Sequence, residues 1–357
     1  MKSIIMIGAG LANLGAAWQL QKSGHDVIIL ERHFPGCGAS GTAAGLLSPS
    51  AEARFGEARL VELELQSMAL WPDFVAEVEQ DSGMTVDYRR EGTLLMAPEP
   101  DDLAAIEHLL AYRESLGLSV QRVSGHEIRE LEPGISPRIS AGLYIGSDHQ
   151  VDAMKLTQAL TKAFLNRGGE IRVDTTVVAV NEALGRVTGV IIESGVGIGA
   201  SCVVAGPGAW AAKIEFQGAI SPQIRPVRGQ IITLGLGNPE ICKHVIRSPR
   251  VYLAPKSSGR LLIGSTIEDV GFDEYLTGGG VRNLLHHARE LLPAIDDAPI
   301  LEMRTGFRPV SVHNEPSVSS SSVQGLVWSV GHGRQGVLLT PWTTRTLTAE
   351  VQAVMSV

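Results

Sequence analysis

Cysteine is scarce in this chain, and its scarcity excludes two classes of site. The 357 residues include only Cys37, Cys202 and Cys242, an odd number spread far apart. A disulfide framework needs pairs and a zinc site needs closely spaced ligands, so we expect neither. We expect no other metal site, because His286 and His287 are adjacent on a predicted helix and should point to different faces. Free thiols suit a reducing cytoplasm.

Long apolar runs and basic clusters are also missing. No uninterrupted apolar stretch reaches the length of a membrane span, and GAG interrupts the N-terminal run that could pass for a secretory signal. A net charge of −8 without a basic block argues against nucleic acid or an anionic membrane as the main partner. The composition, 44% hydrophobic and 19% charged, is that of a globular protein. We therefore expect a cytoplasmic protein with a small-molecule partner.

The N-terminal stretch SIIMIGAGLANLGAAWQLQKSGHDVIILER has the order strand, glycine turn, helix, strand. Ile4 to Ile7 and Val27 to Leu30 are short apolar runs typical of buried parallel strands. Gly8 permits the turn, and Gly10 lets the backbone approach a pyrophosphate at the helix N-terminus. Glu31, at the end of the second strand, can accept hydrogen bonds from both hydroxyls of a ribose. The pattern favours a dinucleotide site over an ordinary glycine turn in an α/β domain.

One position departs from the GxGxxG pattern. Asn13 stands where the third glycine normally allows close packing of helix against strand. We expect Asn13 to push the helix outward or to turn its amide to solvent, and to weaken dinucleotide binding. Gly15, two residues on, should recover some of the space.

The next segment, PGCGASGTAAGLLSPS, is rich in small residues. Such composition costs backbone entropy unless something close by needs the space. A flexible linker is the alternative interpretation. However, Ala43 to Leu47 has the composition of packed chain, so we favour a loop and helix start lying against a flat cofactor.

The rest of the chain alternates between two kinds of sequence pattern. Helical periodicity and buried strands recur in the N-terminal, middle and C-terminal parts, whereas short β segments separated by turns fill the stretch after Val227. The predicted fold class is α/β (α+β overall): a discontinuous Rossmann-like domain with a second, antiparallel-sheet substrate domain. We place residues 1–85, 142–225 and 310–357 in the first domain, and residues 86–141 and 226–309 in the second.

These motifs together resemble the FAD-dependent amine and amino-acid oxidases, the family that contains D-amino-acid oxidase, sarcosine oxidase and glycine oxidase. The likeness runs nearly end to end and is strong in the order and spacing of its motifs. They are IGAGLANLGAAWQL with Glu31, GASGTAAGLLSP, DHQVDAMKL, VVAGPGAWA, PVRGQI, YLAPKSSGRLLIGSTIEDVGFD, TGFRP and GHGRQGVLLTP. Within the family the chain is most similar to the glycine oxidases of the thiamine pathway, with a related likeness to the catalytic subunit of hydrogen cyanide synthase.

The resemblance implies a non-covalent FAD, because no cysteine lies near the C-terminal glycine motif where sarcosine-type enzymes attach their flavin. It assigns to the cofactor, besides Gly8, Gly10 and Glu31, the residues Leu11, Ala12, Arg32, Ala39, Ser40, Ala44, Gly45, Leu46, Val177, Gly331, His332, Gly333, Arg334, Gln335, Gly336, Val337 and Leu338. The stretch His332 to Leu338 would present N–H groups to the pyrimidine edge of the flavin. A helix N-terminus there would also stabilise the negative charge of reduced flavin.

The resemblance also implies a grip on a substrate carboxylate. Arg308 in GFRP would pair with it bidentately, and Tyr252 would add a hydroxyl. Arg334 would sit above the flavin or help to bind the carboxylate. Without the family, an arginine at a strand end is more often an ion-pair residue and a lone tyrosine more often core. No residue is assigned as a general base.

The expected reaction is oxidative deamination of a small amino acid such as glycine or sarcosine. Hydride would pass from Cα to flavin N5, and the imine would be hydrolysed to a 2-oxo acid while O2 becomes hydrogen peroxide. One alternative is a dehydrogenase with another electron acceptor, like cyanide synthase or proline dehydrogenase. Another is a binding or assembly subunit without turnover. We expect a homo-oligomer or a flavoprotein complex.

Two departures from the family pattern bear on the pocket. Gly333 replaces a bulky residue beside the flavin, and His313-Asn314-Glu315-Pro316 replaces a segment that usually ends in Leu-Pro or Lys-Pro. Both changes could widen the pocket or shift its preference.

Overall fold

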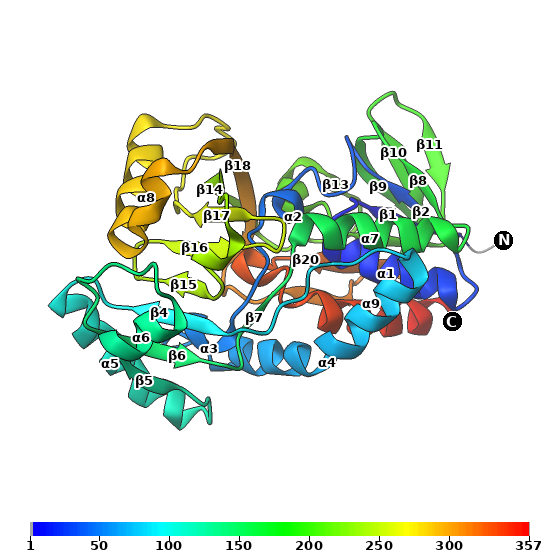
Figure 1. Ribbon diagram of the computed structural model, residues 1–357. Helices are drawn as coiled ribbons and strands as arrows, with labels where there is room; N and C mark the ends of the chain where they lie inside the picture. Colours follow the sequence, from blue (N-terminus) through cyan, green and yellow to red (C-terminus); the bar gives the residue numbers. More distant parts are fainter. Residues whose placement is uncertain (1–2, 357) are drawn as a thin grey trace.

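A mainly parallel sheet built on the N-terminal strand forms one half of the structure, a computed structural model that describes residues 3–356 (Figure 1). In spatial order its six strands are β19 (Ser317–Ser320), β20 (Leu326–Val330), β12 (Cys202–Ala205), β1 (Ser3–Ile7), β2 (Asp26–Leu30) and β8 (Glu170–Arg172). Only β19 is antiparallel to its neighbour. The N-terminal, middle and C-terminal strands thus share one sheet, as the sequence predicts.

Strand β1 has apolar side chains on both faces because both faces are covered. Ile4 and Met6 belong to a core with the helices, whereas Ile5 and Ile7 belong to a core on the opposite face. The helical layer consists of α1 (Leu11–Lys22), α4 (Ala58–Ser82), α7 (Ala153–Asn166) and α9 (Thr340–Met355). The opposite layer is a second sheet of β11 (Gly197–Gly199), β10 (Arg186–Ile192), β9 (Val177–Ala183) and β13 (Glu215–Phe216).

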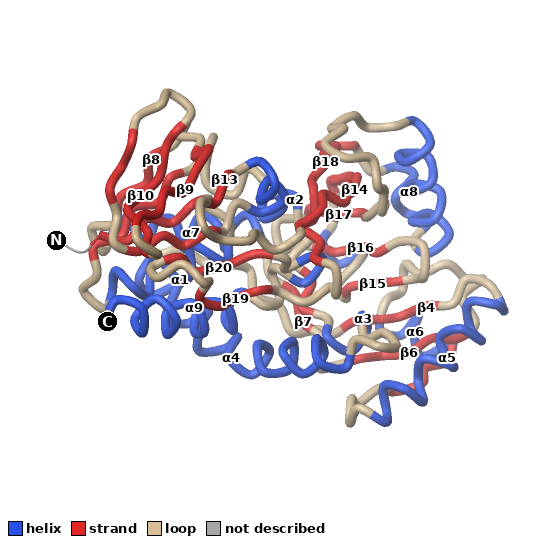
Figure 2. Tube along the Cα trace, turned by 180° about the vertical axis from the view of Figure 1, so that it is seen from behind, coloured by secondary structure: helices blue, strands red, loops and turns tan. Residues whose placement is uncertain are grey.

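An eight-stranded, mostly antiparallel sheet forms the other half, and Figure 2 shows it apart from the first sheet. Its strands, in order, are β18 (Ile300–Ser311), β14 (Ile224–Gly235), β17 (Arg260–Gly264), β16 (Tyr252–Pro255), β15 (Val245–Arg247), β4 (Thr93–Met96), β6 (Ala141–Ile145) and β5 (Gln121–Ser124). Ile232 and Leu234 of β14 face α8 (Gly278–Leu291), whereas Ile231 faces the first half. Helices α5 (Pro100–Ser115) and α6 (Gly125–Leu131) complete this half.

The structure moves several predicted boundaries by a few residues. Strand β6 pairs with β4 and β5, so the eight-stranded sheet includes residues through Ile145, beyond the predicted domain limit at Ala141. Strand β18 likewise continues to Ser311. Ser319 and Ser320 belong to strand β19, which pairs with β20 at the edge of the first sheet. Residues 1, 2 and 357 of the predicted first domain lie outside the described residues.

Three expectations from the sequence concern the cysteines, membrane-spanning segments and the histidine pair His286 and His287. All three cysteines are free thiols. Within residues 3–356 no helix is both long enough and apolar enough to cross a bilayer. The geometric premise for His286 and His287 was wrong, because both rings turn toward Glu290 and the three side chains bring ligand atoms within 4.8 Å of one another. This cluster lies on α8, and none of its members lines the cavity described below.

Candidate active site

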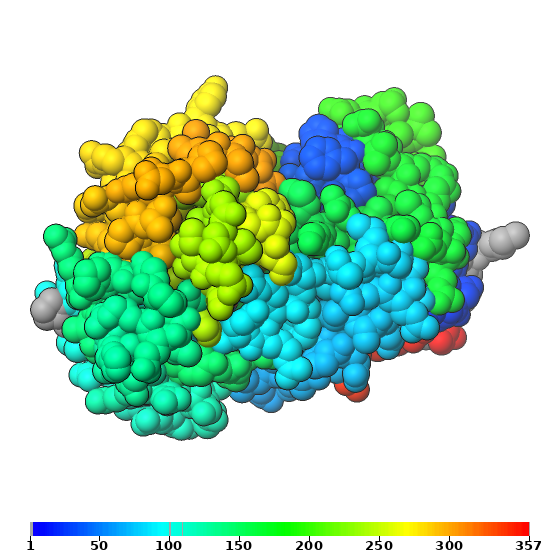
Figure 3. Space-filling model, in the orientation of Figure 1, coloured from blue at the N-terminus to red at the C-terminus, as the bar shows by residue number. Residues whose placement is uncertain are grey.

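A cavity of about 540 Å³ runs from the glycine turn after β1 to the inner face of the eight-stranded sheet. Its size is in the range of small-molecule and cofactor sites. Every residue that the sequence assigned to the cofactor lines this cavity, except Gln335 and Leu338. The space-filling view shows the blue N-terminal segment reaching the surface between the orange and green parts of the chain (Figure 3).

The glycine turn at the end of β1 forms a cradle of backbone at one end of the cavity. Gly8 has a φ of +92°, and a Cβ there would lie 2.6 Å from the carbonyl oxygen of Gly206. The carboxylate of Glu31 is buried and accepts a 2.7 Å hydrogen bond from the amide of Ala9, so it holds the turn itself. The amide of Leu11, at the start of α1, donates to Ser40 Oγ at 3.1 Å. The cradle fits the pyrophosphate of a dinucleotide at a helix N-terminus.

Asn13 does not behave as the sequence suggested. Its side chain is buried, and Nδ2 donates to the carbonyls of Ile7 and Gly8 at 2.8 and 2.9 Å. The amide therefore braces the end of β1 instead of turning to solvent. Gly15 serves another contact, because a Cβ there would lie 2.1 Å from Thr344 Oγ1 of α9. It allows close helix–helix packing.

The small-residue segment is packed chain, not a linker. It forms α2 (Ala39–Thr42), β3 (Leu46–Leu47) and α3 (Pro49–Glu52), and β3 pairs with β7 (His149–Gln150). The buried ammonium of Lys256 donates to the Ala44 carbonyl at 2.7 Å and to the Val151 carbonyl at 3.0 Å. Burial lowers the pKa of Lys256 to about 7. Lys256, in the turn after β16, thus holds two segments of the cavity wall together.

The C-terminal glycine motif forms a short 3₁₀ turn, Gly333–Gln335, and α9 begins only at Thr340. The N–H groups near the cavity therefore belong to this turn and the loop around it. Gly333 has a φ of +54°, and a Cβ there would meet no atom within 4 Å, so its replacement of a bulky residue leaves open space. His332 contacts Thr343 Oγ1 at 3.0 Å, and burial lowers its pKa to about 4, so it is neutral at pH 7.

Arg308 on β18 presents a guanidinium to the cavity without a carboxylate partner among residues 3–356. It donates to Ser265 Oγ at 2.5 Å and to the carbonyls of Arg228 and Thr266 at 3.3 and 3.2 Å. Burial raises the pKa of the Tyr252 phenol, and the nearby Arg308 charge opposes that rise. A guanidinium oriented by neutral acceptors retains its charge for an anionic ligand.

Arg334 is held differently from Arg308. Its Nε donates to Glu52 at 3.2 Å, and its Nη atoms pair with Glu57. These ion pairs remove the free charge on which the predicted role in substrate binding depended. Asn314, from the segment that departs from the family pattern, also donates to Glu57 at 3.0 Å.

Sequence reasoning missed Glu52 and Arg247, which both line the cavity. Arg247 donates to Glu52 Oε1 at 2.7 Å, and its guanidinium lies 5.9 Å from the Tyr252 ring centroid. Burial alone would raise the pKa of Glu52, but Arg247 and Arg334 hold it below its ordinary value. No local pattern marks this pair, because 195 positions separate its members.

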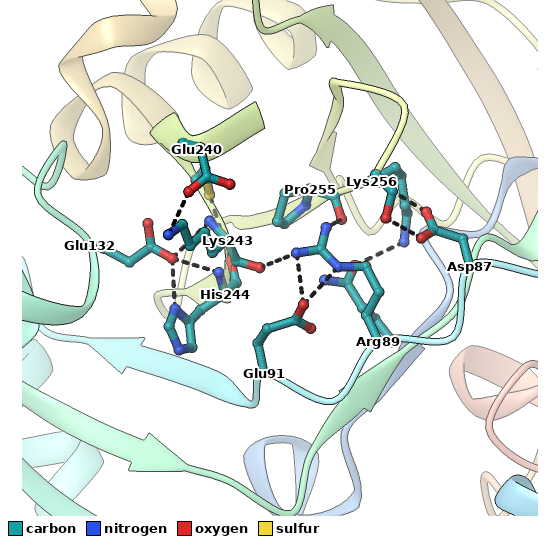
Figure 4. A network of polar contacts seen from close by, with 12 residues as sticks. Asp87, Arg89, Glu91, Glu132, Glu240, Lys243, His244, Pro255 and Lys256 are labelled. Carbon is teal, nitrogen blue, oxygen red and sulfur yellow. Dashed lines mark hydrogen bonds and ion pairs between the residues drawn. The ribbon is translucent and has the colours of Figure 1, made fainter. Parts of the chain in front are cut away.

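A second polar network holds the strands that carry Arg247 and Tyr252 (Figure 4). Glu132 accepts hydrogen bonds from the amides of Lys243 and His244, just before β15. Arg89 donates to the carbonyl of Lys243 at 2.9 Å and to that of Pro255, at the end of β16, at 3.1 Å. Arg89 thus ties the segment before β15 to the end of β16.

Comparison with known proteins agrees with this geometry. The sequence profile of the FAD dependent oxidoreductase (DAO) family matches residues 3–350. Glycine oxidase from Geobacillus kaustophilus is 31% identical over 95% of this chain and 90% of that protein. Hydrogen cyanide synthase subunit HcnC from Pseudomonas aeruginosa is 26% identical over 94% of this chain and 88% of that protein.

Solved structures agree as well. The crystal structure of glycine oxidase from G. kaustophilus, 29% identical, matches with a TM-score of 0.90 over 99% of this chain and 95% of that one. Iminodiacetate oxidase from Chelativorans sp. BNC1, 26% identical, matches with a TM-score of 0.87 over 98% of this chain and 95% of that one. The protein therefore belongs to the DAO family of FAD-dependent oxidoreductases and is an enzyme that uses FAD to oxidise an amine or amino acid.

Proposed function

We propose that the enzyme oxidatively deaminates a small amino acid or N-substituted glycine. In the proposed reaction the substrate, O2 and water give a 2-oxo acid, ammonia or a primary amine, and hydrogen peroxide. The observation that carries the proposal is Arg308, whose guanidinium faces the cavity with its charge uncompensated beside the Tyr252 phenol. A carboxylate is the ligand that this pair suits best.

The residues of the chain position the substrate in this proposal. Arg308 and Tyr252 bind the carboxylate and so fix where the α-carbon lies. Bound FAD supplies the acceptor for the two electrons of the Cα–H bond, and the Gly8 cradle and Glu31 hold its adenosine end. The FAD is proposed to be non-covalent. Catalysis by orientation needs a neutral substrate amine and no side-chain base.

The side chains near Arg308 support a reaction without such a base. His332 is neutral and hydrogen-bonded to Thr343. Glu52 is engaged by Arg247 and Arg334. His332 and Glu52 both line the cavity, but neither side chain is free to take a proton from the substrate.

A second candidate differs in the electron acceptor. This candidate is a dehydrogenase that passes electrons to a dye, quinone or partner protein instead of O2. The relatives include hydrogen cyanide synthase subunit HcnC as well as glycine oxidase, so family membership does not select the acceptor. The names of the relatives also differ in the amine, so family membership leaves open which group the substrate carries besides its α-carboxylate.

The test is an anaerobic titration of the purified yellow protein. Glycine and sarcosine should bleach the flavin absorbance, whereas methylamine, which lacks a carboxylate, should not. Readmitting air should restore the colour within seconds for an oxidase, and only an added dye should restore it for a dehydrogenase. A protein that stays colourless with added FAD, or that no amino acid reduces, would contradict the proposal.

A further inference from the structure

Arg54 is a second cavity-lining arginine without a partner. It follows α3 directly and is exposed at the cavity wall. Within residues 3–356 its side chain makes no hydrogen bond or ion pair, and it acts on Glu52 only through its charge. An uncompensated guanidinium on a cavity wall attracts anions.

The cavity wall around Arg54 carries an excess of positive charge. Arg247 is paired with Glu52, and Arg334 is paired with Glu57. Among residues 3–356, Arg54 and Arg308 have no carboxylate partner, and neither do Arg32 and Lys213, whose cations lie over the rings of Trp210 and Phe272 elsewhere on the lining. The buried carboxyl group of Glu64 supplies no further negative charge, because burial raises its pKa to about 9.

Asp148 does not cancel the excess either. Burial raises its pKa to about 7, and its oxygens accept hydrogen bonds from the amides of Ser50 and Ala51. The guanidinium of Arg113, also buried, donates to the carbonyls of the same two residues and opposes the Asp148 charge. Asp148 and Arg113 thus both hold α3 and offset each other's charge, so the positive charges of Arg54 and Arg308 stay uncompensated.

A chain of contacts runs along one wall of the cavity from Glu52, near Arg54 in the sequence, to Arg308. Glu52 lies two residues before Arg54 and holds Arg247, whose guanidinium lies over the Tyr252 ring. Arg308 donates a hydrogen bond to Ser265, and the Tyr252 phenol lies near both residues. The glycine cradle, where a pyrophosphate fits, is formed by other elements, at the end of β1. Arg54 therefore belongs to the substrate part of the cavity.

We propose that Arg54 forms a second anion subsite and selects amines with two acidic groups. Arg308 takes the α-carboxylate, and the second acid lies on the substituent of the amine nitrogen or of Cα. A substrate with one carboxylate would leave Arg54 unused. The inference rests on the proposed function, since it assumes that Arg308 binds the α-carboxylate.

Binding of unreactive analogues tests this inference without turnover. Diglycolate and methoxyacetate differ by one carboxylate on the N-substituent side, and malate and lactate differ by one on the Cα side. Their dissociation constants are measured by calorimetry on the FAD-loaded enzyme, for wild type, Arg54→Gln and the control Arg59→Gln. Arg59 carries the same charge nearby in sequence, but it pairs with Glu315 and does not line the cavity.

We expect at least one dianion to bind wild type and R59Q tenfold or more tightly than its monoanionic counterpart. In R54Q that advantage should fall below threefold, while binding of the monoanions stays unchanged. The inference is overturned if neither dianion binds more tightly than its counterpart, or if the advantage survives in R54Q. Reduction of the flavin by sarcosine in the same preparation would show that the proposed function stands even then.

Discussion

The ammonium of Lys256 lies 2.7 Å from the carbonyl oxygen of Ala44, and this contact joins the two halves of the enzyme at the cavity wall. Lys256 belongs to the turn between β16 and β17, and Ala44 precedes β3. The same ammonium donates to Gln150 Oε1 at 3.0 Å. A buried cation bound by three acceptors is a fixed point of the structure, because breaking the contacts would leave buried polar groups unpaired.

Replacing Lys256 with Met should therefore weaken FAD binding. The apolar side chain fills similar space but leaves the carbonyls of Ala44 and Val151 without their donor. We expect the FAD dissociation constant, measured by fluorescence on apoprotein, to rise at least tenfold. The control Lys162→Met changes an exposed lysine of α7 and should leave the constant unchanged. Equal constants for K256M and wild type would contradict this role.

Glu64 should make the protein less stable in alkaline solution. It is buried on α4, its carboxylate oxygens have no hydrogen-bond partner within residues 3–356, and burial raises its pKa from 4.5 to about 9. The unfolded chain ionises above pH 4.5 while the folded carboxyl stays protonated, so stability falls between pH 4.5 and 9 by up to about 1.4 kcal/mol per pH unit. Glu64→Gln should match wild type near pH 4.5 and melt several degrees higher at pH 8.

The matched control is Glu62→Gln, which changes an exposed carboxylate of the same helix. Its melting curve should follow that of wild type at both pH values. If E64Q and wild type lose stability in parallel as the pH rises, the carboxyl group is ionised in the folded state and the assignment is wrong.

His332 should act in the opposite pH range. Its pKa falls from 6.5 to about 4 in the folded state because of burial, so only the unfolded chain binds a proton between these values. Stability is therefore complete above pH 6.5 and decreases by up to about 3 kcal/mol as the pH falls to 4. His332→Gln keeps a group that can hydrogen-bond to Thr343 and should flatten this decrease, as followed by urea denaturation. The exposed His313→Gln should not.

Asn13→Gly should weaken FAD binding, although it restores the GxGxxG pattern. The two hydrogen bonds from Asn13 to Ile7 and Gly8 shape the turn, and each is worth about 1 kcal/mol. We expect the FAD dissociation constant to rise about tenfold. Tighter binding by N13G would support the expectation from the motif, that Asn13 displaces the helix and weakens FAD binding.

The turn, the acid and the parallel sheet could be predicted because each has a local signature. Short apolar runs around Gly8 and Gly10 and the position of Glu31 identify a strand–turn–helix–strand unit by spacing alone. Arg308 and Tyr252 were found only through resemblance, because a single arginine or tyrosine carries no pattern of its own.

The errors have a common physical cause. Asn13 donates hydrogen bonds to the backbone carbonyls of Ile7 and Gly8. Whether its amide turns inward to make these bonds depends on geometry that a motif does not encode. The partners Glu52 and Arg247, like Lys256 and Ala44, come from distant parts of the chain and meet only in the folded structure. His286 and His287 converge because both rotate toward Glu290. Contacts between distant parts of the chain decide which buried charged side chains pair with each other.

The most direct test of the central claim compares sarcosine with sarcosinamide as reductants of the flavin under anaerobic conditions. The two differ in the group that Arg308 is proposed to bind, a carboxylate in sarcosine and an uncharged amide in sarcosinamide. Wild type should be reduced at least a hundredfold faster by sarcosine at equal low concentrations, and Arg308→Gln should lose most of that preference. A preference for sarcosine that survives undiminished in R308Q would show that the carboxylate is bound elsewhere.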